Sequence, residues 1–301
     1  MTLVCDEAVD IQTYVDERIN LINRRLDQLV EETPSPYGVL YSAARYSLLG
    51  GGKRLRPLLA VATAEALGAD AQTALTPACS LELIHAYSMI HDDLPCMDDD
   101  DFRRGKPTLH KLYPEGIAVL AGDFLLTYAF EVITKAPSLT AEQHLQLVST
   151  LAQAAGGHGM VGGQVMDLEA EGKAIDLRAL QLIHQCKTGA LLSAAFEFGG
   201  IVANASDTTM KLLQKLGQQL GLAFQIVDDV LDVTASETKH GKAHSSDVTN
   251  VKTTYVSLMG VEASSKKARD LLAQSLELLE QLPGETHVLK ALANRLVNRN
   301  M

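Results

Sequence analysis

The stretch HDDLPCMDDDDFRRGKP, residues 91–107, places six aspartates within ten positions and follows them with Arg103, Arg104 and Lys106. A largely apolar run, LELIHAYSMI at 81–90, directly precedes it. Clustered carboxylates repel one another, so something cationic must compensate them. Mg²⁺ accepts carboxylate oxygens and commonly shares them with substrate phosphates. This stretch therefore predicts an apolar helix that ends in a metal and phosphate site.

A second acidic cluster, FQIVDDVLD at 224–232, also follows an apolar helical run. Asp228 and Asp232 are four positions apart and share a helix face, with Gln225 one turn earlier. One such cluster alone is more often a solvated acidic face. Two clusters, each joined to an apolar helix, favour metal binding.

The spacing within the first cluster is irregular for a helix. Asp92 is followed at the fourth position by Cys96, and the next acid is Asp98. Six residues turn an ideal helix by about 240°, so these carboxylates cannot share one face of a regular helix. Pro95 lies between them and disturbs the hydrogen-bond ladder. If both aspartates bind metal, the helix must bulge or end near Pro95.

The remaining pattern is helical throughout, with breaks at stretches such as PSP (34–36) and GGGK (50–53). Strand-like alternation with tight hairpin turns is missing. The polar stretch 234–247 predicts a surface loop between two helices. One all-α domain over residues 1–301 is expected. The clearest apolar periodicities, with spacing of three to four, cover Asp10–Glu32, Thr140–Ala155, Leu177–Val202 and Ser206–Val233.

Composition excludes several classes of protein. A net charge of -11 argues against nucleic-acid binding and requires local cations for any anionic substrate. Four scattered cysteines give neither a disulfide framework nor a zinc motif, which favours a reducing, cytoplasmic location. The first ten residues lack a basic signal-peptide region, and no apolar run reaches the roughly 18–20 residues of a membrane span.

Basic residues also cluster beside glycine. GGGKRLRP at 50–57 carries Lys53, Arg54 and Arg56. Glycine permits close backbone approach to an anion, and arginine matches phosphate oxygens in bidentate geometry. Lys187 and Thr188 interrupt an apolar run, and His85 lies two helical turns before Asp92. Each feature alone is more often structural or solvated.

In combination these motifs resemble the trans-isoprenyl diphosphate synthases, most closely the bacterial-type farnesyl diphosphate synthases. The resemblance extends over nearly the whole chain, and the ordered set is highly specific. It rests on GGKRLRP, LELIHAYSMIHDDLPCMDDDDFRRGKPT, AGDFLL, GMVGGQVMDL, KTGALL, FQIVDDVLD and the run from Gly241 to Lys252 that leads into TTY.

The resemblance implies a bundle of antiparallel helices around a deep central cavity, usually a homodimer, and three bound Mg²⁺ ions, with Mn²⁺ as the alternative. It implies metal binding by Asp92, Asp98, Asp228 and Asp232, supported by Asp93 and Asp229. Isopentenyl diphosphate would be held by Lys53, Arg56, His85 and Arg104. The allylic diphosphate would be held by Arg103, Lys187, Lys242 and Lys252. Thr188 and Gln225 would lie beside the developing carbocation, making Lys187, Thr188 and Gln225 the catalytic set, and Gln164 and Asp167 would line the cavity. Lys239, His240 and His244 receive no role.

Tyr87 and Ser88, five and four positions before Asp92, match family positions that limit product length. A bulky Tyr87 implies a fifteen-carbon product; a geranylgeranyl diphosphate synthase shares every other motif and is the alternative. A terpene cyclase lacks the second diphosphate pocket that GGKRLRP and Arg104 indicate. A non-catalytic subunit would be expected to have lost an aspartate motif, and both are intact here.

Overall fold

Helices dominate the computed structural model, which describes residues 10–32, 34–238 and 253–298. One π-helical turn, η1, and one short antiparallel hairpin, β1–β2, accompany the α-helices of the described residues. The elements are α1 (Ile11–Leu29), α2 (Gly38–Leu48), α3 (Leu55–Ala66), α4 (Ala71–Asp92), β1 (Phe102–Arg103), β2 (Lys106–Pro107), α5 (Leu109–Leu112), α6 (Glu115–Thr134), α7 (Ala141–Ala155), α8 (Met160–Ala170), α9 (Leu177–His184), η1 (Gln185–Gly189), α10 (Ala190–Val202), α11 (Asp207–Thr238), α12 (Tyr255–Met259), α13 (Val261–Gln281) and α14 (His287–Val297).

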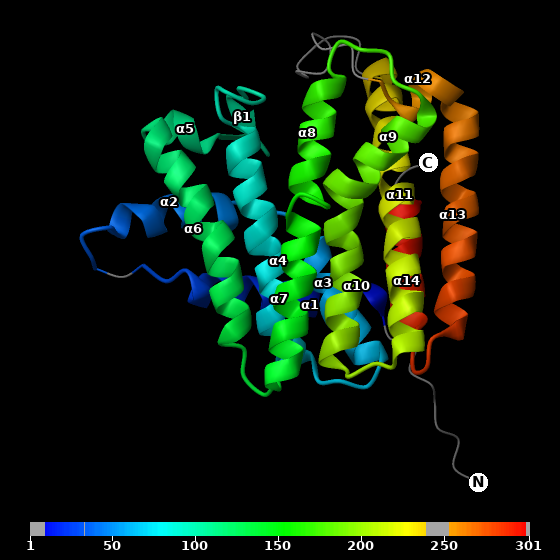
Figure 1. Ribbon diagram of the computed structural model, residues 1–301, viewed down its shortest axis with the longest axis horizontal. Coiled ribbons are helices and arrows are strands. Elements are labelled where there is room, and N and C mark those ends of the chain that lie inside the picture. Colours follow the sequence, from blue (N-terminus) through cyan, green and yellow to red (C-terminus); the bar gives the residue numbers. More distant parts are fainter. Residues whose placement is uncertain (1–9, 33, 239–252, 299–301) are drawn as a thin grey trace.

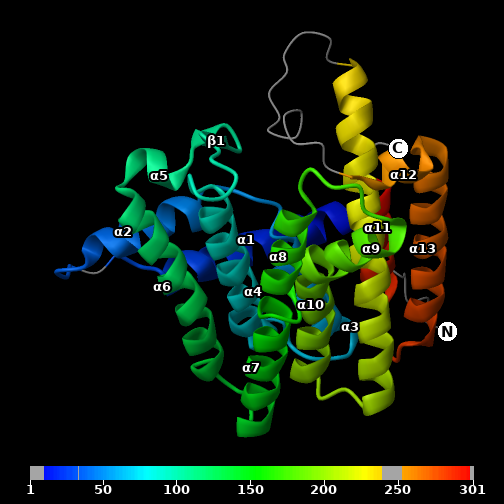
Figure 2. The ribbon, with the colours of Figure 1, turned by 45° about the horizontal axis from the view of Figure 1, so that its top comes forward.

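The long helices stand side by side as a bundle (Figure 1). Helix α4 packs against α3 and α6, whereas α10 packs against α3, α7 and α11. Helix α11 lies between α10 and α13 and is the longest; Figure 2 shows its upper part standing clear of its neighbours. The β1–β2 hairpin and the C-terminal end of α4 lie toward the same end of the bundle as this projecting part. The all-α antiparallel bundle predicted from the sequence is confirmed.

Local sequence signals set the helix boundaries. The carboxylate of Asp10 accepts hydrogen bonds from the backbone N–H groups of Gln12 and Thr13 at the start of α1. Thr140 and Gln143 form a reciprocal capping box at the start of α7. These side chains satisfy N–H groups that the first turn of a helix leaves without backbone partners. The predicted helical windows therefore end within a few residues of the observed ones.

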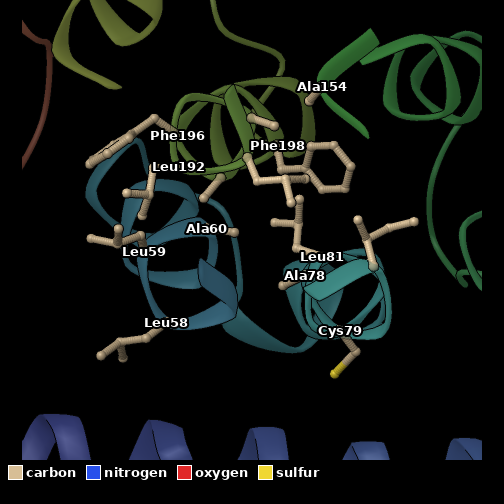
Figure 3. Packing of buried hydrophobic residues seen from close by; sticks show 14 of the residues in the cluster. Leu58, Leu59, Ala60, Ala78, Cys79, Leu81, Ala154, Leu192, Phe196 and Phe198 are labelled. Carbon is tan, nitrogen blue, oxygen red and sulfur yellow. The ribbon is translucent and has the colours of Figure 1, made fainter. Parts of the chain in front are cut away.

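The core is centred on α10, whose residues from Leu191 to Val202 are nearly all buried. Phe198 of α10 faces Leu81 of α4, whereas Leu58 of α3 and Cys79 of α4 point away from α10 toward α1 (Figure 3). Gly199 permits close packing of α10 on α3, because a Cβ there would lie 2.4 Å from the side chain of Thr63. Small residues on α3 and α10 thus draw α3 close to the middle of the bundle.

Two expectations need correction. Helix α11 continues to Thr238, so the loop predicted from residue 234 begins later. The chain also forms a two-residue-per-strand hairpin at 102–107, where no strands were expected. Helix α6 is long and apolar enough by length and composition alone to cross a membrane, with a mean hydropathy of 1.7. It nevertheless packs against α2, α4 and α7 and buries Leu125 and Ile133 completely, as a core helix does.

Candidate active site

The acidic cluster at residues 92–98 forms a turn at the end of α4. The helix ends at Asp92, and the backbone N–H of Asp98 donates to the carbonyl of Asp92 at 2.9 Å. This bond spans six residues, where a regular helix would use four. The N–H of Asp99 likewise donates to the carbonyl of Leu94. The break expected near Pro95 is confirmed, and it folds Asp98 back toward Asp92.

The charge around Asp92 shows which groups meet at this turn. Burial raises the pKa of Asp92 to about 6, and the charges of Asp98 and Asp93 act in the same direction. Lys187 and Arg103 oppose them. The structure therefore brings the two predicted metal-binding aspartates and two predicted phosphate-binding cations into one electrostatic neighbourhood, although they come from separate motifs.

The side chain of Asp93 binds Arg103 and so fixes the β1–β2 hairpin. Its buried Oδ1 accepts from Arg103 Nε at 2.7 Å and Nη2 at 2.5 Å. Arg104 and Gly105, with φ of 52° and 74°, form the tight turn between β1 and β2. Arg104 Nη1 then donates to the carbonyl of Gly51 in the glycine-rich loop. Asp93 thus supports the site by holding Arg103, and the hairpin carries Arg104 to the second basic motif.

A cavity of about 930 Å³ opens between α1, α3, α4, α11 and α14. It is lined by side chains from several of the predicted groups. Apolar lining comes from residues such as Val15 and Leu58. The predicted site residues that line it are Lys53, Arg56, His85, Arg104, Thr188, Gln225 and Asp228.

The cations of this cavity lie close enough to influence one another. Burial lowers the pKa of Arg56, and the charge of Arg104 lowers it further, whereas Glu82 opposes them. Burial, together with Arg56 and Arg104 among its neighbours, holds the pKa of His85 well below its usual value. Arg56 Nε is buried and has no acceptor within the described part of the chain. Such a buried donor in a positive cavity is suited to an anionic ligand.

Lys187 and Thr188 lie on η1, the π-helical turn between α9 and α10. Single π-helical turns inside helices often occur at functional sites because they alter side-chain direction. Lys187 Nζ donates to Asp167 Oδ2 at 2.7 Å, linking η1 to α8. Gly163 makes this approach possible, since a Cβ there would lie 2.2 Å from the backbone nitrogen of Lys187. Gly163 of GMVGGQ thus allows the turn that carries Lys187 to pack against α8.

The second acidic cluster occupies one face of α11, as its spacing predicted. Gln225 and Asp228 line the cavity, and Asp232 follows one turn later at an exposed position. Asp229 is buried, and its Oδ2 accepts the backbone N–H of Tyr255 at 2.7 Å. Asp229 therefore anchors the start of α12. The predicted Lys242 and Lys252, like Lys239, His240 and His244, lie outside the described residues.

The proposed chain-length residues sit deeper in α4. Tyr87 is 5% exposed and packs edge-on against His91 with ring centroids 5.7 Å apart. Burial and the charge of Asp92 raise the pKa of Tyr87 to about 12. Ser88 Oγ donates to the carbonyl of His85 at 3.0 Å. Neither side chain lines the 930 Å³ cavity, so their role in product length stays a prediction.

Sequence reasoning missed two charged residues of the cavity wall, Glu82 and Arg295, and named Arg54 without giving it a role. Glu82 had a usable signal, because it is the one acidic residue in the apolar run 81–90. Arg295 had a weaker signal, since it shares a face of α14 with the cavity-lining Leu292. Only the packing of α14 against α3 and α11 brings that face to the site.

Comparisons with known proteins agree with this geometry. Residues 38–295 match the polyprenyl synthetase family. The chain is 46% identical to a farnesyl diphosphate synthase of Haemophilus influenzae, covering 92% of this chain and 95% of that one. It is 42% identical to a geranylgeranyl diphosphate synthase of Cyanophora paradoxa, covering 97% of both chains. A crystal structure of an FPP/GFPP synthase from Zymomonas mobilis superposes with a TM-score of 0.86 at 37% identity, covering 96% of this chain and 99% of that one. The chain belongs to the polyprenyl synthetase family and is a prenyltransferase.

Proposed function

We propose that this protein is a farnesyl diphosphate synthase, which condenses isopentenyl diphosphate with dimethylallyl and then geranyl diphosphate. The observation that carries the proposal is the arrangement of cations in two groups. Lys53, Arg56 and Arg104 line the cavity, whereas Arg103 and Lys187 act on the carboxyl of Asp92 at the end of α4. Two diphosphates in one reaction require two such groups, and a terpene cyclase requires one.

Magnesium fits the carboxylates of the site. The charge of Asp98 raises the pKa of Asp92, as expected for carboxylates that face a shared region. Across the described ranges, no three His, Cys, Asp or Glu side chains form a cluster that could hold a metal ion. Mg²⁺ commonly uses one or two carboxylates together with substrate phosphates, so a closed cage is not needed. We assign its binding to Asp92, Asp98, Asp228 and Asp232; when bound, it neutralises diphosphate charge and makes the diphosphate a better leaving group.

The side chains of the protein have separate tasks in the condensation. Arg103 and Lys187 bind the allylic diphosphate, and their charge stabilises it as the allylic C–O bond breaks. Thr188 and Gln225 direct oxygen atoms toward the resulting carbocation. Lys53, Arg56, His85 and Arg104 hold isopentenyl diphosphate so that its double bond attacks the allylic carbon. A proton then leaves the new chain, and the departing diphosphate accepts it, since neutral His85 is committed to the substrate.

The same proposal includes the assembly and location of the enzyme. One polyprenyl synthetase domain over residues 1–301 is supported by a single buried cluster that extends from Tyr14 to Val297. A homodimer is supported by exposed apolar side chains on α6 to α9, including Leu120, Leu145 and Val165. A cytoplasmic location is supported by the unpaired Cys79, Cys96 and Cys186.

Product analysis tests the proposal. The protein is incubated with Mg²⁺, isopentenyl diphosphate and either dimethylallyl or geranyl diphosphate, and the dephosphorylated alcohols are separated by chromatography. A fifteen-carbon alcohol is expected. A twenty-carbon alcohol would favour a geranylgeranyl diphosphate synthase instead, and no condensation at all would refute the synthase assignment. Light scattering during size-exclusion chromatography tests the dimer.

A further inference from the structure

Arg54 is the cation of the GGGKRLRP motif that the proposed function leaves without a task. It precedes α3 directly and has a left-handed backbone, with φ of 47° and ψ of 35°. A residue with a Cβ adopts this conformation at a cost, and it persists where the surrounding structure holds it in place. Its neighbours Lys53 and Arg56 both line the cavity. The backbone at Arg54 therefore sets where these two side chains point.

The guanidinium of Arg54 connects three other parts of the bundle. Nε donates to Asn23 Oδ1 of α1 at 2.8 Å, and Nη2 donates to the carbonyl of Leu48 at the end of α2, also at 2.8 Å. Nη1 donates to Glu82 Oε1 of α4 at 2.7 Å. Both Arg54 and Glu82 are 4% exposed. All three nitrogens have acceptors, so Arg54 serves the protein rather than a ligand.

Glu82 also acts on the cations around it. It lies one turn before His85 on α4, and its charge opposes the effect of burial on the pKa values of Arg56 and Arg104. Without a carboxylate at this position, these arginines would repel one another across a partly dehydrated cavity. The pair therefore holds the backbone of the loop in place and offsets charge at the same point.

We propose that the buried Arg54–Glu82 pair is a positioning device for the isopentenyl diphosphate subsite, which fixes the left-handed turn that presents Lys53 and Arg56. The inference rests on the proposed function, because it takes Lys53, Arg56 and Arg104 as the ligands of that substrate. The pair should affect the binding of isopentenyl diphosphate only, because the allylic diphosphate is assigned to Arg103 and Lys187, which lie on other elements.

Arg54→Lys is the decisive variant, because it keeps the positive charge and loses the planar three-way hydrogen bonding. KM for isopentenyl diphosphate is expected to rise about tenfold, the effect of weakening one charge-assisted hydrogen bond. KM for geranyl diphosphate and kcat should stay within about twofold of wild type, since nothing at α8 or η1 is altered. Glu82→Gln should shift the same KM in the same direction and serves if Arg54→Lys does not fold.

Arg18→Lys is the matched control. Arg18 of α1 binds Glu65 at the far end of α3 with a 2.6 Å contact, so the variant weakens another Arg–Glu pair, more exposed than Arg54–Glu82, away from the cavity. It should lower the thermal unfolding midpoint and leave both KM values unchanged. If Arg54→Lys behaves like Arg18→Lys, or raises both KM values equally, the pair is merely structural and the inference is wrong.

Calorimetric binding of isopentenyl diphosphate separates this inference from the proposed function. Failure of the wild-type protein to condense the two substrates would refute the function before any variant is compared. Equal Kd values for wild type and Arg54→Lys would overturn the positioning role whether or not condensation occurs. A weaker Kd for the variant, with folding intact, supports it.

Discussion

Replacing Gly163 with alanine should displace the turn that carries Lys187. The added Cβ would lie 2.2 Å from Lys187 N, 2.5 Å from Lys187 Cα and 2.8 Å from the carbonyl carbon of Cys186. Ordinary contact begins at 3.4 Å, so α8 and η1 must separate by about 1.2 Å at this point. All three contacts are with backbone atoms, which cannot rotate away as the end of a side chain can.

A shift of either α8 or η1 disturbs the ion pair between Asp167 and Lys187. Asp167 lies on α8 one turn after Gly163, and its carboxylate holds Lys187 Nζ at 2.7 Å. Moving α8 displaces Asp167, and moving η1 displaces Lys187 and Thr188 together. Misplacement of a reacting group by about 1 Å costs on the order of 100-fold in rate. Overpacking of this kind also lowers the free energy of unfolding by about 1–3 kcal/mol.

The prediction is therefore a fall in kcat of about 100-fold in a variant that still folds. It is measured with saturating geranyl and isopentenyl diphosphates at a temperature well below the unfolding midpoint. Gly157→Ala is the matched control, since a Cβ at Gly157 meets nothing within 4 Å. A folded Gly163→Ala variant with kcat within twofold of wild type would refute the role given to Lys187 and Thr188.

Three further perturbations follow from the same structure. Tyr87→Ala should lengthen the product beyond fifteen carbons, and an unchanged alcohol in the chromatogram would contradict the assigned chain-length role. Asp93→Asn weakens the charge-assisted hydrogen bonds to Arg103, so urea denaturation should show a loss of about 2 kcal/mol. KM for the allylic substrate should also rise, and unchanged values of both would contradict the role given to Asp93. Burial lowers the pKa of His184 to about 4, so the folded state keeps His184 neutral while the unfolded state gains a proton below about pH 6.5. Stability from this group is thus present above pH 6.5 and is lost as the pH falls toward 4, by on the order of 2 kcal/mol at pH 5, and His184→Gln should lessen the difference between urea midpoints at pH 7 and pH 5.

The helices were predictable because their signals are local. Apolar spacing and capping residues such as Asp10 and Thr140 act within one or two turns, and the break near Pro95 follows from helix geometry alone. The failures share a different cause. Polar residues at 234–238 continue α11 although they lack apolar anchors, and residues 102–107 pair as a hairpin although they lack strand-like alternation. Neither property can be read from a short window of sequence.

The sequence named most of the charged residues of the candidate site but not the contacts between them. Lys53, Arg56, His85 and Arg104, which were grouped from the sequence, all line one cavity, and their binding of isopentenyl diphosphate stays a prediction. The sequence did not show that Arg54, flanked by them, is committed to Glu82. Nor did it show the approach of Arg295, which depends on packing between segments more than 200 positions apart. Such contacts are properties of the tertiary fold.

The division among the arginines explains how a chain of net charge -11 can present a cationic cavity. In each basic motif one arginine is bound by a buried carboxylate, Arg54 by Glu82 and Arg103 by Asp93. The other member of each pair, Arg56 or Arg104, lines the cavity, and Arg104 donates to a neutral backbone carbonyl. A carboxylate holds its arginine strongly enough to fix the backbone around it, whereas a carbonyl yields more readily to a diphosphate. The acidic residues inside the site therefore do not weaken anion binding as their charge alone would suggest. They fix the positions from which the neighbouring arginines reach the ligand.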